Sequence, residues 1–287
     1  MLKYPIAEIT LFFDLEWVPD AEAAKRLYNL PADTTEADAM QKLWEMSSGY
    51  SEDVPHPFVK YLFSRIVSIA FLSRRRIYRE GELGIEFRLN SYPALPDNPG
   101  SIKPEDVIES EIIKRFLDAV GKKRPNLVGF NSSESDFQVL IQRGIINEVS
   151  APDFCRRPEK NWEADDYFKR WDNEMHLDLA KLFGNSKLMP KLDEIAKLCG
   201  YPGKIDTSGD QVWQLWLNRD LDQIIKYNRL DVLNTYLIWL RIAYFTGKLS
   251  DEEYQMEQDD FRAFLENEAA KPSGDYIKKF LSAWIEH

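Results

Sequence analysis

The sequence predicts an α/β protein in which a mixed β-sheet is flanked by helices. Three observations lead to this fold class. Short apolar runs rich in β-branched and aromatic residues lie in the first third of the chain, a strand-like and a helical segment alternate in the middle, and helical periodicity dominates the last third. A chain that passes from strands through a strand–helix alternation to helices is typical of an α/β layer architecture.

Four segments have the character of β-strands. Residues 6–13 and 65–72 are apolar runs that predict buried strands. Residues 84–89 alternate apolar with charged side chains, which predicts a half-exposed strand. Residues 127–130 form a short apolar run that predicts a fourth, buried strand.

Helices are predicted where apolar residues recur at helical spacing. This spacing predicts helices over residues 105–120, 136–146 and 221–245, and Gly247 is expected to end the last one. Residues 150–174 are polar and contain proline, so we expect a long surface loop there.

Charge and composition suggest how the chain is organised. We expect residues 1–249 to form one domain, with the polar, helix-leaning stretch 20–57 as an insertion or flap. Residues 250–287 hold ten acidic and four basic residues, or -6 of the net charge of -11, and are expected to form an acidic helical C-terminal extension.

Composition also indicates a cytoplasmic protein. Hydrophobic residues make up 44% of the chain and charged residues 30%, which is an ordinary globular balance. No apolar window is long enough for a transmembrane helix, and the first residues lack the apolar core of a secretory signal. The two cysteines, Cys155 and Cys199, are too few for a disulfide framework. We therefore expect no membrane partner and free thiols in a reducing compartment.

Several kinds of active site are excluded by their missing motifs. The sequence has no phosphate-binding or dinucleotide-binding glycine loop, no G-x-S-x-G, no H-E-x-x-H and no Cys-x-x-Cys. Only three histidines are present, so carboxylates must carry most of any chemistry. The net charge of -11 argues against a protein that coats nucleic acid, but not against an enzyme that engages one strand end through metal ions.

Acidic residues occur at three suggestive places. Asp14 and Glu16 follow the first predicted strand and share one face, where a cation would relieve their repulsion. Asp136 follows a short buried strand and a small-residue turn that contains Asn131. Asp231 lies four residues after Tyr227 on one face of the longest predicted helix, near its buried stripe.

Each place also has a purely structural interpretation. Acids often follow a strand because the chain reaches solvent there, and Ser135 or Asp136 is suited to cap a helix. Asp231 has Lys226 and Arg229 nearby as possible ion-pair partners. Taken singly, these places therefore remain ambiguous.

The order of the three places is more specific. Asp-x-Glu after a first strand, Asn-x-x-x-x-Asp after a later strand and Tyr-x-x-x-Asp on a C-terminal helix resemble the three motifs of the DEDD exonuclease superfamily, tyrosine subtype. The closer resemblance is to predicted 3'-5' exonucleases related to the proofreading domain of family B DNA polymerases, over about residues 8–245. Further segments that fit are 67–70, 176–179, 192–196, 200–204, 209–212 and 235–237.

The sequence departs from the usual family pattern at a few positions. Ser135 stands where phenylalanine is usual, Trp17 where threonine is usual, and Asn228-Arg229 where Cys-Glu is frequent. All four acids and the tyrosine are present, so these departures concern substrate contacts more than catalysis.

The resemblance implies a ribonuclease H-like fold with a five-stranded mixed sheet, in which residues 1–249 are a 3'-5' exonuclease domain. It implies two divalent cations, Mg²⁺ or Mn²⁺, and hydrolysis from the 3' end of single-stranded nucleic acid, with DNA favoured over RNA. The implied metal ligands are Asp14, Glu16, Asp136 and Asp231, with Tyr227 as the further catalytic residue, and the implied substrate contacts are Leu15, Trp17, Asn131 and Lys204.

Three alternatives remain open from the sequence. A module of the same fold that binds a nucleic-acid end without cutting it would give no degradation with either metal. An RNA-directed 3'-5' exonuclease would differ only in its substrate. A glycoside hydrolase built on a carboxylate pair would be active without a metal.

Overall fold

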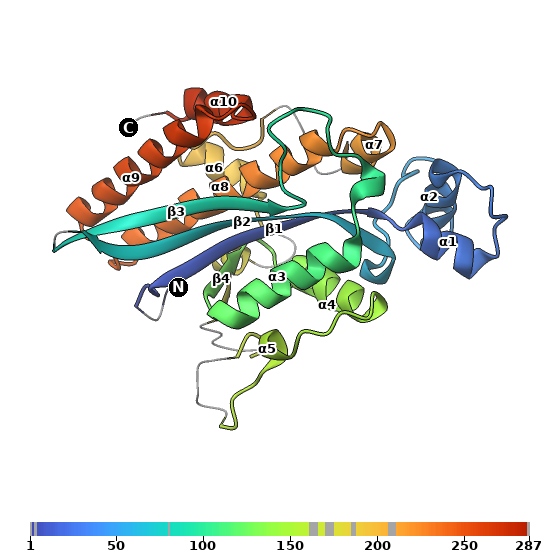
Figure 1. Ribbon diagram of the computed structural model, residues 1–287, viewed down its shortest axis with the longest axis horizontal. Coiled ribbons are helices and arrows are strands. Elements are labelled where there is room, and N and C mark those ends of the chain that lie inside the picture. The colour runs from blue at the N-terminus through green and yellow to red at the C-terminus, as the bar shows by residue number, and fades with distance from the viewer. Residues whose placement is uncertain are drawn as a thin grey trace.

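A five-stranded mixed β-sheet runs through the centre of the molecule (Figure 1). The computed structural model describes residues 2, 5–79, 81–160, 166–169, 175–184, 188–205 and 211–285. The strands are β1 (Ile9–Pro19), β2 (Ser64–Arg79), β3 (Glu82–Tyr92), β4 (Asn126–Gly129) and β5 (His176–Asp178). Their order is β3-β2-β1-β4-β5, antiparallel among β3, β2 and β1 and parallel among β1, β4 and β5. This confirms the predicted fold class, and the order agrees with a ribonuclease H-like fold.

The central strand β1 is longer than the sequence indicates. It was expected over residues 6–13, but pairing with β2 continues from Ile9 to Pro19, with a register shift between Glu16 and Trp17. Asp14 and Glu16 therefore lie inside the strand and not after its end. The reason is that the neighbouring strand supplies backbone partners whatever the side chains are, so two acids do not end the pairing.

Alternation along β1 separates the two faces of the sheet. Leu11, Phe13 and Leu15 belong to a core cluster on the face of helices α3 (Glu109–Lys123) and α4 (Asp136–Ile146). Phe12 belongs to a second cluster on the face of helix α8 (Leu221–Phe245). Because successive side chains of a strand point to opposite faces, Asp14 and Glu16 share the α8 face with Phe12. The predicted bounds of α4 and α8 are confirmed.

The predicted insertion at residues 20–57 contains two helices at one end of the sheet (Figure 1). These are α1 (Ala21–Tyr28) and α2 (Glu36–Glu45). Trp44 of α2 packs edge-on against His56 at 4.5 Å and against Trp213 at 5.0 Å between ring centroids. Trp213 lies on α7 (Val212–Leu217), so this aromatic group ties the insertion to the rest of the domain.

The predicted surface loop at residues 150–174 is partly wrong. Its described residues include helix α5 (Pro152–Cys155), and the side chains of Phe154 and Tyr167 are only 2% and 1% exposed. The two rings stack at 5.3 Å, and Tyr167 donates a hydrogen bond to the carbonyl of Pro125. The polar composition of this stretch predicted an exposed loop, and it hid the fact that two of its aromatic residues are buried. Residues 161–165 and 170–174 lie outside the described residues, as does the first half of the family-like segment 209–212.

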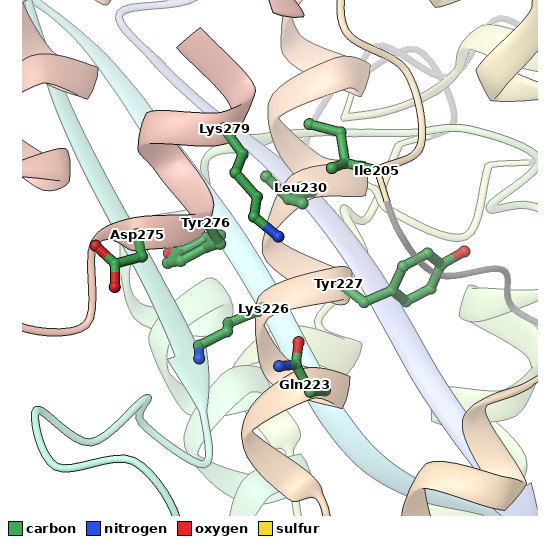
Figure 2. Close-up of a pocket in the computed structure, with 8 residues that line it drawn as sticks. All are labelled: Ile205, Gln223, Lys226, Tyr227, Leu230, Asp275, Tyr276 and Lys279. Atoms are coloured by element: carbon green, nitrogen blue, oxygen red, sulfur yellow. The ribbon is translucent and has the colours of Figure 1, made fainter. Parts of the chain in front are cut away.

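Two C-terminal helices cover the α8 side of the sheet. They are α9 (Asp251–Ala269) and α10 (Asp275–Ala283), and α6 (Leu192–Leu198) lies on the same side. Their helical character agrees with the prediction for residues 250–287, but Phe261, Leu265, Ile277 and Phe280 are fully buried in the second core cluster. Tyr276 of α10 lies beside α8 (Figure 2). In the described part of the chain, no helix combines the length and apolarity needed to span a membrane.

A buried ion pair joins α9 to the sheet. Arg74 of β2 and Glu257 of α9 are 0% and 1% exposed, and two hydrogen bonds of 2.6 Å connect them. Tyr236 of α8 donates a third hydrogen bond to Glu257 at 3.0 Å. Arg74 belongs to a basic triplet, Arg74-Arg75-Arg76, that from sequence alone is a candidate to guide nucleic acid; the structure places Arg74 in the core instead.

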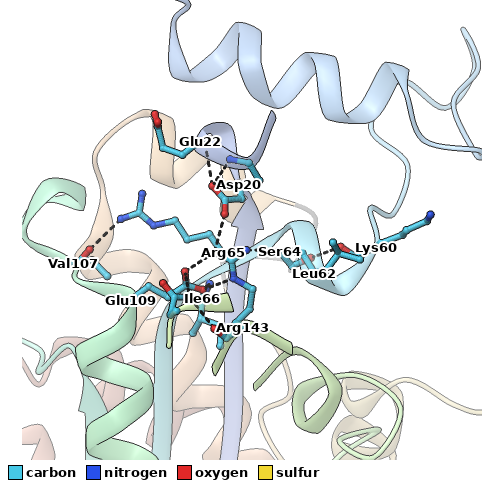
Figure 3. A network of polar contacts seen from close by, with 12 residues as sticks. Asp20, Glu22, Lys60, Leu62, Ser64, Arg65, Ile66, Val107, Glu109 and Arg143 are labelled. Carbon is cyan, nitrogen blue, oxygen red and sulfur yellow. Dashed lines mark hydrogen bonds and ion pairs between the residues drawn. The ribbon is translucent and has the colours of Figure 1, made fainter. Parts of the chain in front are cut away.

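A second buried network fixes α4 against the sheet (Figure 3). Arg143 of α4 donates hydrogen bonds to Glu109 of α3, to Asp20 at the end of β1 and to the carbonyl of Leu62. Glu109 also accepts a hydrogen bond of 2.7 Å from the backbone of Ile66 in β2. This network holds four elements in fixed positions, and α4 carries Asp136 at its first residue.

We expect Glu257→Ala to destabilise the fold strongly. The substitution leaves the buried Arg74 without its carboxylate, a change that typically costs about 3–5 kcal/mol. Urea unfolding followed by circular dichroism measures the change. Glu266→Ala, at an exposed position of the same helix, is the matched control and should cost less than about 0.5 kcal/mol. Equal midpoints for the two variants would contradict the assignment.

Candidate active site and metal centre

Three elements bring the predicted acids together. Asp14 and Glu16 leave the same face of β1, and Tyr227 and Asp231 lie one helical turn apart on α8, which packs on that face. Asp136 is the first residue of α4, directly after the turn that follows β4. Residues separated by more than two hundred positions therefore meet at the centre of the molecule.

Asp14, Glu16 and Asp231 form a compact group. Each offers a carboxylate oxygen that lies within 4.8 Å of those of the other two. Asp231 is 6% exposed, and its Oδ1 is buried without a hydrogen-bond partner among the described residues. A buried carboxylate oxygen without a donor is costly, whereas hard oxygen ligands are those that Mg²⁺ and Mn²⁺ prefer. The residues present therefore fit a divalent cation.

Asp136 lies beside this group but is held differently. It is 4% exposed; its Oδ1 accepts a hydrogen bond of 3.0 Å from the backbone of Leu15, and its Oδ2 accepts one of 2.7 Å from Ser135. Its charge contributes to the raised pKa of Asp14, which places it close to that residue. Ser135 makes no side-chain cap on α4, so its hydroxyl serves Asp136 instead.

All four acids have raised pKa values. Burial is the largest cause in each case, and the neighbouring carboxylates add to it for Asp14 and Glu16, whose pKa values lie well above the ordinary range. The pKa values of Asp136 and Asp231 are raised to about 6. A cluster of this kind is stable only with protons or cations among its carboxylates.

Lys204 is the basic partner of the site. Its Nζ lies 3.8 Å from Oδ2 of Asp231 and donates a short hydrogen bond to the hydroxyl of Tyr227. The sequence had suggested Lys226 or Arg229 as the partner of Asp231, and this is wrong. Arg229 instead contacts Ser91 and Tyr276.

Tyr227 keeps its proton over the physiological range. Burial, followed by the negative charges of Asp231, Glu16 and Asp14, raises its pKa far above that of free tyrosine. Its oxygen accepts the hydrogen bond from Lys204, and a hydrogen bond to Asp231 further raises the pKa of Tyr227. These properties suit a residue that orients a water molecule more than one that deprotonates it.

Two successive buried hydrogen bonds, from Ser68 to Asn228 and from Asn228 to Asp14, hold Asp14 in place. The sequence did not predict this relay. Asn228 of α8 is 0% exposed and donates a hydrogen bond of 2.6 Å to Oδ2 of Asp14. Its own carbonyl accepts one of 2.9 Å from Ser68 of β2, which is also fully buried. Asn228 had been noted only as a departure from the family pattern. The available signal was its place within the buried stripe of the helix.

The predicted substrate contacts lie around the acids. Leu15 has its side chain in the core and meets the site through its backbone N–H. Asn131 adopts a left-handed backbone conformation, φ 57°, and its carbonyl accepts a hydrogen bond from Ser135, so it shapes the turn before Asp136. Lys204 reaches Tyr227 and Asp231, as described above.

Trp17 belongs to an aromatic group at the rim of the site. Its ring meets that of Tyr61 edge-on at 6.3 Å, and Tyr61 meets Phe58 at 5.1 Å. Phe58 is 62% exposed. Tyr61 donates a hydrogen bond to the carbonyl of Glu134, and the charge of Asp136 contributes, after burial, to its raised pKa. Sequence reasoning missed Tyr61 because it lies outside the motifs.

His176 and Asp178 of β5 hold the turn before Asp136 through hydrogen bonds. His176 is 8% exposed, pairs with the hydroxyl of Ser132 at 2.9 Å and stacks on Phe137. Burial lowers its pKa to about 4, so the ring is neutral at physiological pH. Asp178 accepts hydrogen bonds from the backbone of Ser133 and Ala180, which fixes the turn before Asp136.

We expect the metal-free site to lower stability as pH rises. The folded pKa of Asp231, about 6, exceeds the value of about 3.9 for an unfolded aspartate, so the folded state binds more protons between these values. Its contribution is present below about pH 4 and is lost as pH rises through about 6. In EDTA, the unfolding free energy of the native chain should fall by roughly 2–3 kcal/mol relative to Asp231→Asn between pH 4 and 7.5.

Divalent cations should reverse this loss. At pH 7.5, Mg²⁺ or Mn²⁺ at about 100 times its dissociation constant should raise Tm by roughly 5 °C, and the gain should shrink below pH 6 as protons compete. Differential scanning fluorimetry measures both effects. A gain of the same size in Asp231→Asn would show that the cations bind elsewhere.

We expect Asn228→Ala to weaken metal binding without unfolding the protein. Loss of the donor leaves Asp14 free to rotate, and residues that orient a metal ligand typically contribute about 10–100-fold to metal affinity. Mn²⁺ titration followed by electron paramagnetic resonance gives the affinity. Ser68→Ala should have a smaller effect in the same direction, because it acts on Asp14 through Asn228. Unchanged Mn²⁺ affinity in Asn228→Ala would refute the relay.

The comparison with known families identifies the family of the chain. A family model described as "Predicted 3'-5' exonuclease related to the exonuclease domain of PolB" matches residues 56–284. The matched range includes Asp136, Tyr227 and Asp231 and extends into α10, whereas Asp14 and Glu16 precede it. No curated protein matches the chain. The match covers most of the sequence, and the chain belongs to this family of predicted 3'-5' exonucleases.

Proposed function

We propose that the protein is a metal-dependent 3'-5' exonuclease that hydrolyses single-stranded DNA from its 3' end by a two-metal-ion mechanism. The observation that carries this proposal is the group Asp14, Glu16 and Asp231, whose carboxylate oxygens lie within 4.8 Å of one another. Oδ1 of Asp231 has no hydrogen-bond partner among the residues that the structure describes. Family membership supports the reaction type. The relationship to a polymerase exonuclease domain supports DNA as the substrate.

The acids would hold the cations. Asp14, Glu16 and Asp231 form the nearest ligand set, and Asp136 would join it by exchanging one of its two hydrogen bonds. Cations bound here would supply Lewis acidity, which lowers the pKa of an attacking water and stabilises the departing 3' oxygen. Asn228 keeps one oxygen of Asp14 engaged and leaves the other to face the centre of the group.

Tyr227 and Lys204 would position the reactants. With a cation on Asp231, the protonated phenol of Tyr227 would turn its hydrogen bond from Asp231 toward a water molecule at the acids, while Lys204 still donates to its oxygen. The side chain of Lys204 is 30% exposed, so its charge is also available to a phosphate oxygen.

The aromatic group of Trp17, Phe58 and Tyr61 would hold bases near the 3' end. Base stacking on aromatic side chains is tolerant of sequence, as a general exonuclease requires. The raised pKa of Tyr61, to which Asp136 contributes, indicates that this group lies close to the acids.

A binding module that holds a strand end without cutting it is the second candidate. Both oxygens of Asp136 are occupied by protein donors, which favours a site with fewer metal ligands than two cations need. In that case the acids would anchor a single cation and the strand would stay intact.

The exonuclease should release nucleotides stepwise from a 5'-labelled oligonucleotide. Mg²⁺ or Mn²⁺ should produce a ladder that shortens from the 3' end, and EDTA should abolish it. Asp14→Asn and Asp231→Asn should each lower the rate more than about 100-fold, beyond the range for residues that act through a ligand. Denaturing gels on matched DNA and RNA measure the rate and the substrate preference.

Asp118→Asn, on the surface of α3, removes a carboxylate far from the site and should keep the wild-type rate. Intact oligonucleotide with either metal would favour the binding module. Cleavage that persists in EDTA would instead favour metal-independent chemistry. Wild-type rates in Asp231→Asn would show that the site assignment is wrong.

A further inference from the structure

A pocket lies between α8 and α10, and Tyr227 of the candidate site is part of its lining (Figure 2). Its volume is about 140 Å³, several times the roughly 30 Å³ that one water molecule occupies in the liquid. This is enough for a phosphate group. The lining residues are Ile205, Gln223, Lys226, Tyr227, Leu230, Asp275, Tyr276 and Lys279.

The charged lining of this pocket is predominantly basic. Lys226 comes from α8 and Lys279 from α10, and Figure 2 shows the Lys279 chain reaching from α10 toward α8. Lys226 is half-buried and has no carboxylate within ion-pair distance in the part of the chain that the structure describes. The one acid of the lining, Asp275, already pairs with Lys278 at 2.9 Å. Of the two lining lysines, Lys226 is therefore the one that the described residues leave without an ion pair, whereas Lys279 makes a contact of its own.

The pocket lies next to the candidate site, so its lysines could attract the phosphates of a nucleic acid. The chain carries -11 overall, and the acids beside Tyr227 repel phosphates, so a nucleic acid that approaches the site needs local positive charge. Tyr227 connects the two places, because its hydroxyl accepts a hydrogen bond from Lys204 and its side chain also lines the pocket. Arg229 adds a further cation at the pocket wall, where it contacts the hydroxyl of Tyr276.

We propose that the pocket formed by Gln223, Lys226 and Lys279 is a phosphate-binding subsite for the substrate of the neighbouring site. This inference rests on the proposed nuclease function. The lysines neutralise the phosphate, and the amide of Gln223 donates a hydrogen bond to it. The phosphate has two sources, an unreacted backbone phosphate of the bound strand and the 5'-phosphate of the nucleotide after it has left the acids. The subsite gives α10, within the C-terminal acidic segment, a part in substrate binding.

The test compares two double variants of the full chain. Lys226→Ala/Lys279→Ala removes both lysines from the pocket, whereas Lys114→Ala/Arg115→Ala removes the same charge from exposed positions of α3 on the other face of the sheet. The probe is a fluorescent single-stranded oligonucleotide with 3' phosphorothioate linkages, in Mg²⁺. Fluorescence anisotropy gives its affinity as a function of salt concentration.

The pocket variant should bind the oligonucleotide about tenfold more weakly than the wild type. Its slope of log affinity against log salt concentration should also be shallower, by about 0.7 for each phosphate that the lysines neutralise in the wild type. With unmodified oligonucleotide, KM should rise about tenfold while kcat is unchanged, because the lysines do not touch the reacting atoms. If the pocket holds the released nucleotide, deoxyadenosine monophosphate should inhibit the wild type but not the pocket variant. Unchanged affinity, salt slope and inhibition would overturn the subsite.

Failure of the subsite can be told apart from failure of the nuclease function. If the wild type cuts the oligonucleotide and the pocket variant matches it in every measurement, only the subsite is wrong. If the wild type cuts nothing, inorganic phosphate still reports on the pocket by differential scanning fluorimetry. A rise in Tm confined to the wild type and the α3 variant supports the subsite, and equal behaviour in all three proteins overturns it.

Discussion

The burial of like-charged carboxylates at the centre of the molecule is the constraint on which the rest of the structure depends. Asp14, Glu16, Asp136 and Asp231 come from three different elements, and burial raises the pKa of each. Removing charge from water is unfavourable unless a counter-charge compensates for it. A protein that keeps such a cluster must hold it together by the packing of its scaffold and complete it with protons or cations.

The scaffold around the cluster contains buried arginines that are each paired with a carboxylate. Arg143, in the last turn of α4, joins Glu109 and Asp20 where β1 ends and α3 begins, and Arg74 joins Glu257 where α9 covers the sheet. Removing one member of such a pair is far more costly than the pair is stabilising, so these contacts fix positions more than they add stability. The paired networks lie around the active site, and the incompletely paired carboxylates lie within it. Ion pairing therefore distinguishes buried residues that support the fold from buried residues of the candidate site, and burial alone does not.

The sequence singled out the acids by their chemistry and order, which are local features, and the structure brings Asp14, Glu16 and Asp231 together. It also predicted α4 and α8, whose apolar spacing is strong. It misplaced the end of β1, because hydrogen bonds from β2 extend the strand past Asp14 whatever its side chain prefers. The hydrogen bonds of Asn228 and Ser68 were not predicted. A small polar residue among buried apolar residues does not indicate its function until its partner on another element is known. Lys204 was chosen by resemblance, and its contact with Asp231 depends on a chain reversal that spacing does not show.

Residues 226–231 of α8 make different contacts although they are neighbours in the sequence, because they point in different directions from the helix. Successive helical residues point about 100° apart, so neighbours in the chain serve different surroundings. Tyr227 and Asp231, four residues apart, lie on the face of α8 that meets Asp14 and Glu16. Asn228 donates its hydrogen bond to Asp14. Lys226 lines the pocket against α10, and Arg229 contacts Tyr276. A rotation of this helix by one position would place Lys226 among the carboxylates and remove the donor from Asp14. The packing of α8 on β1 therefore sets the register of the metal site and that of the basic pocket at once.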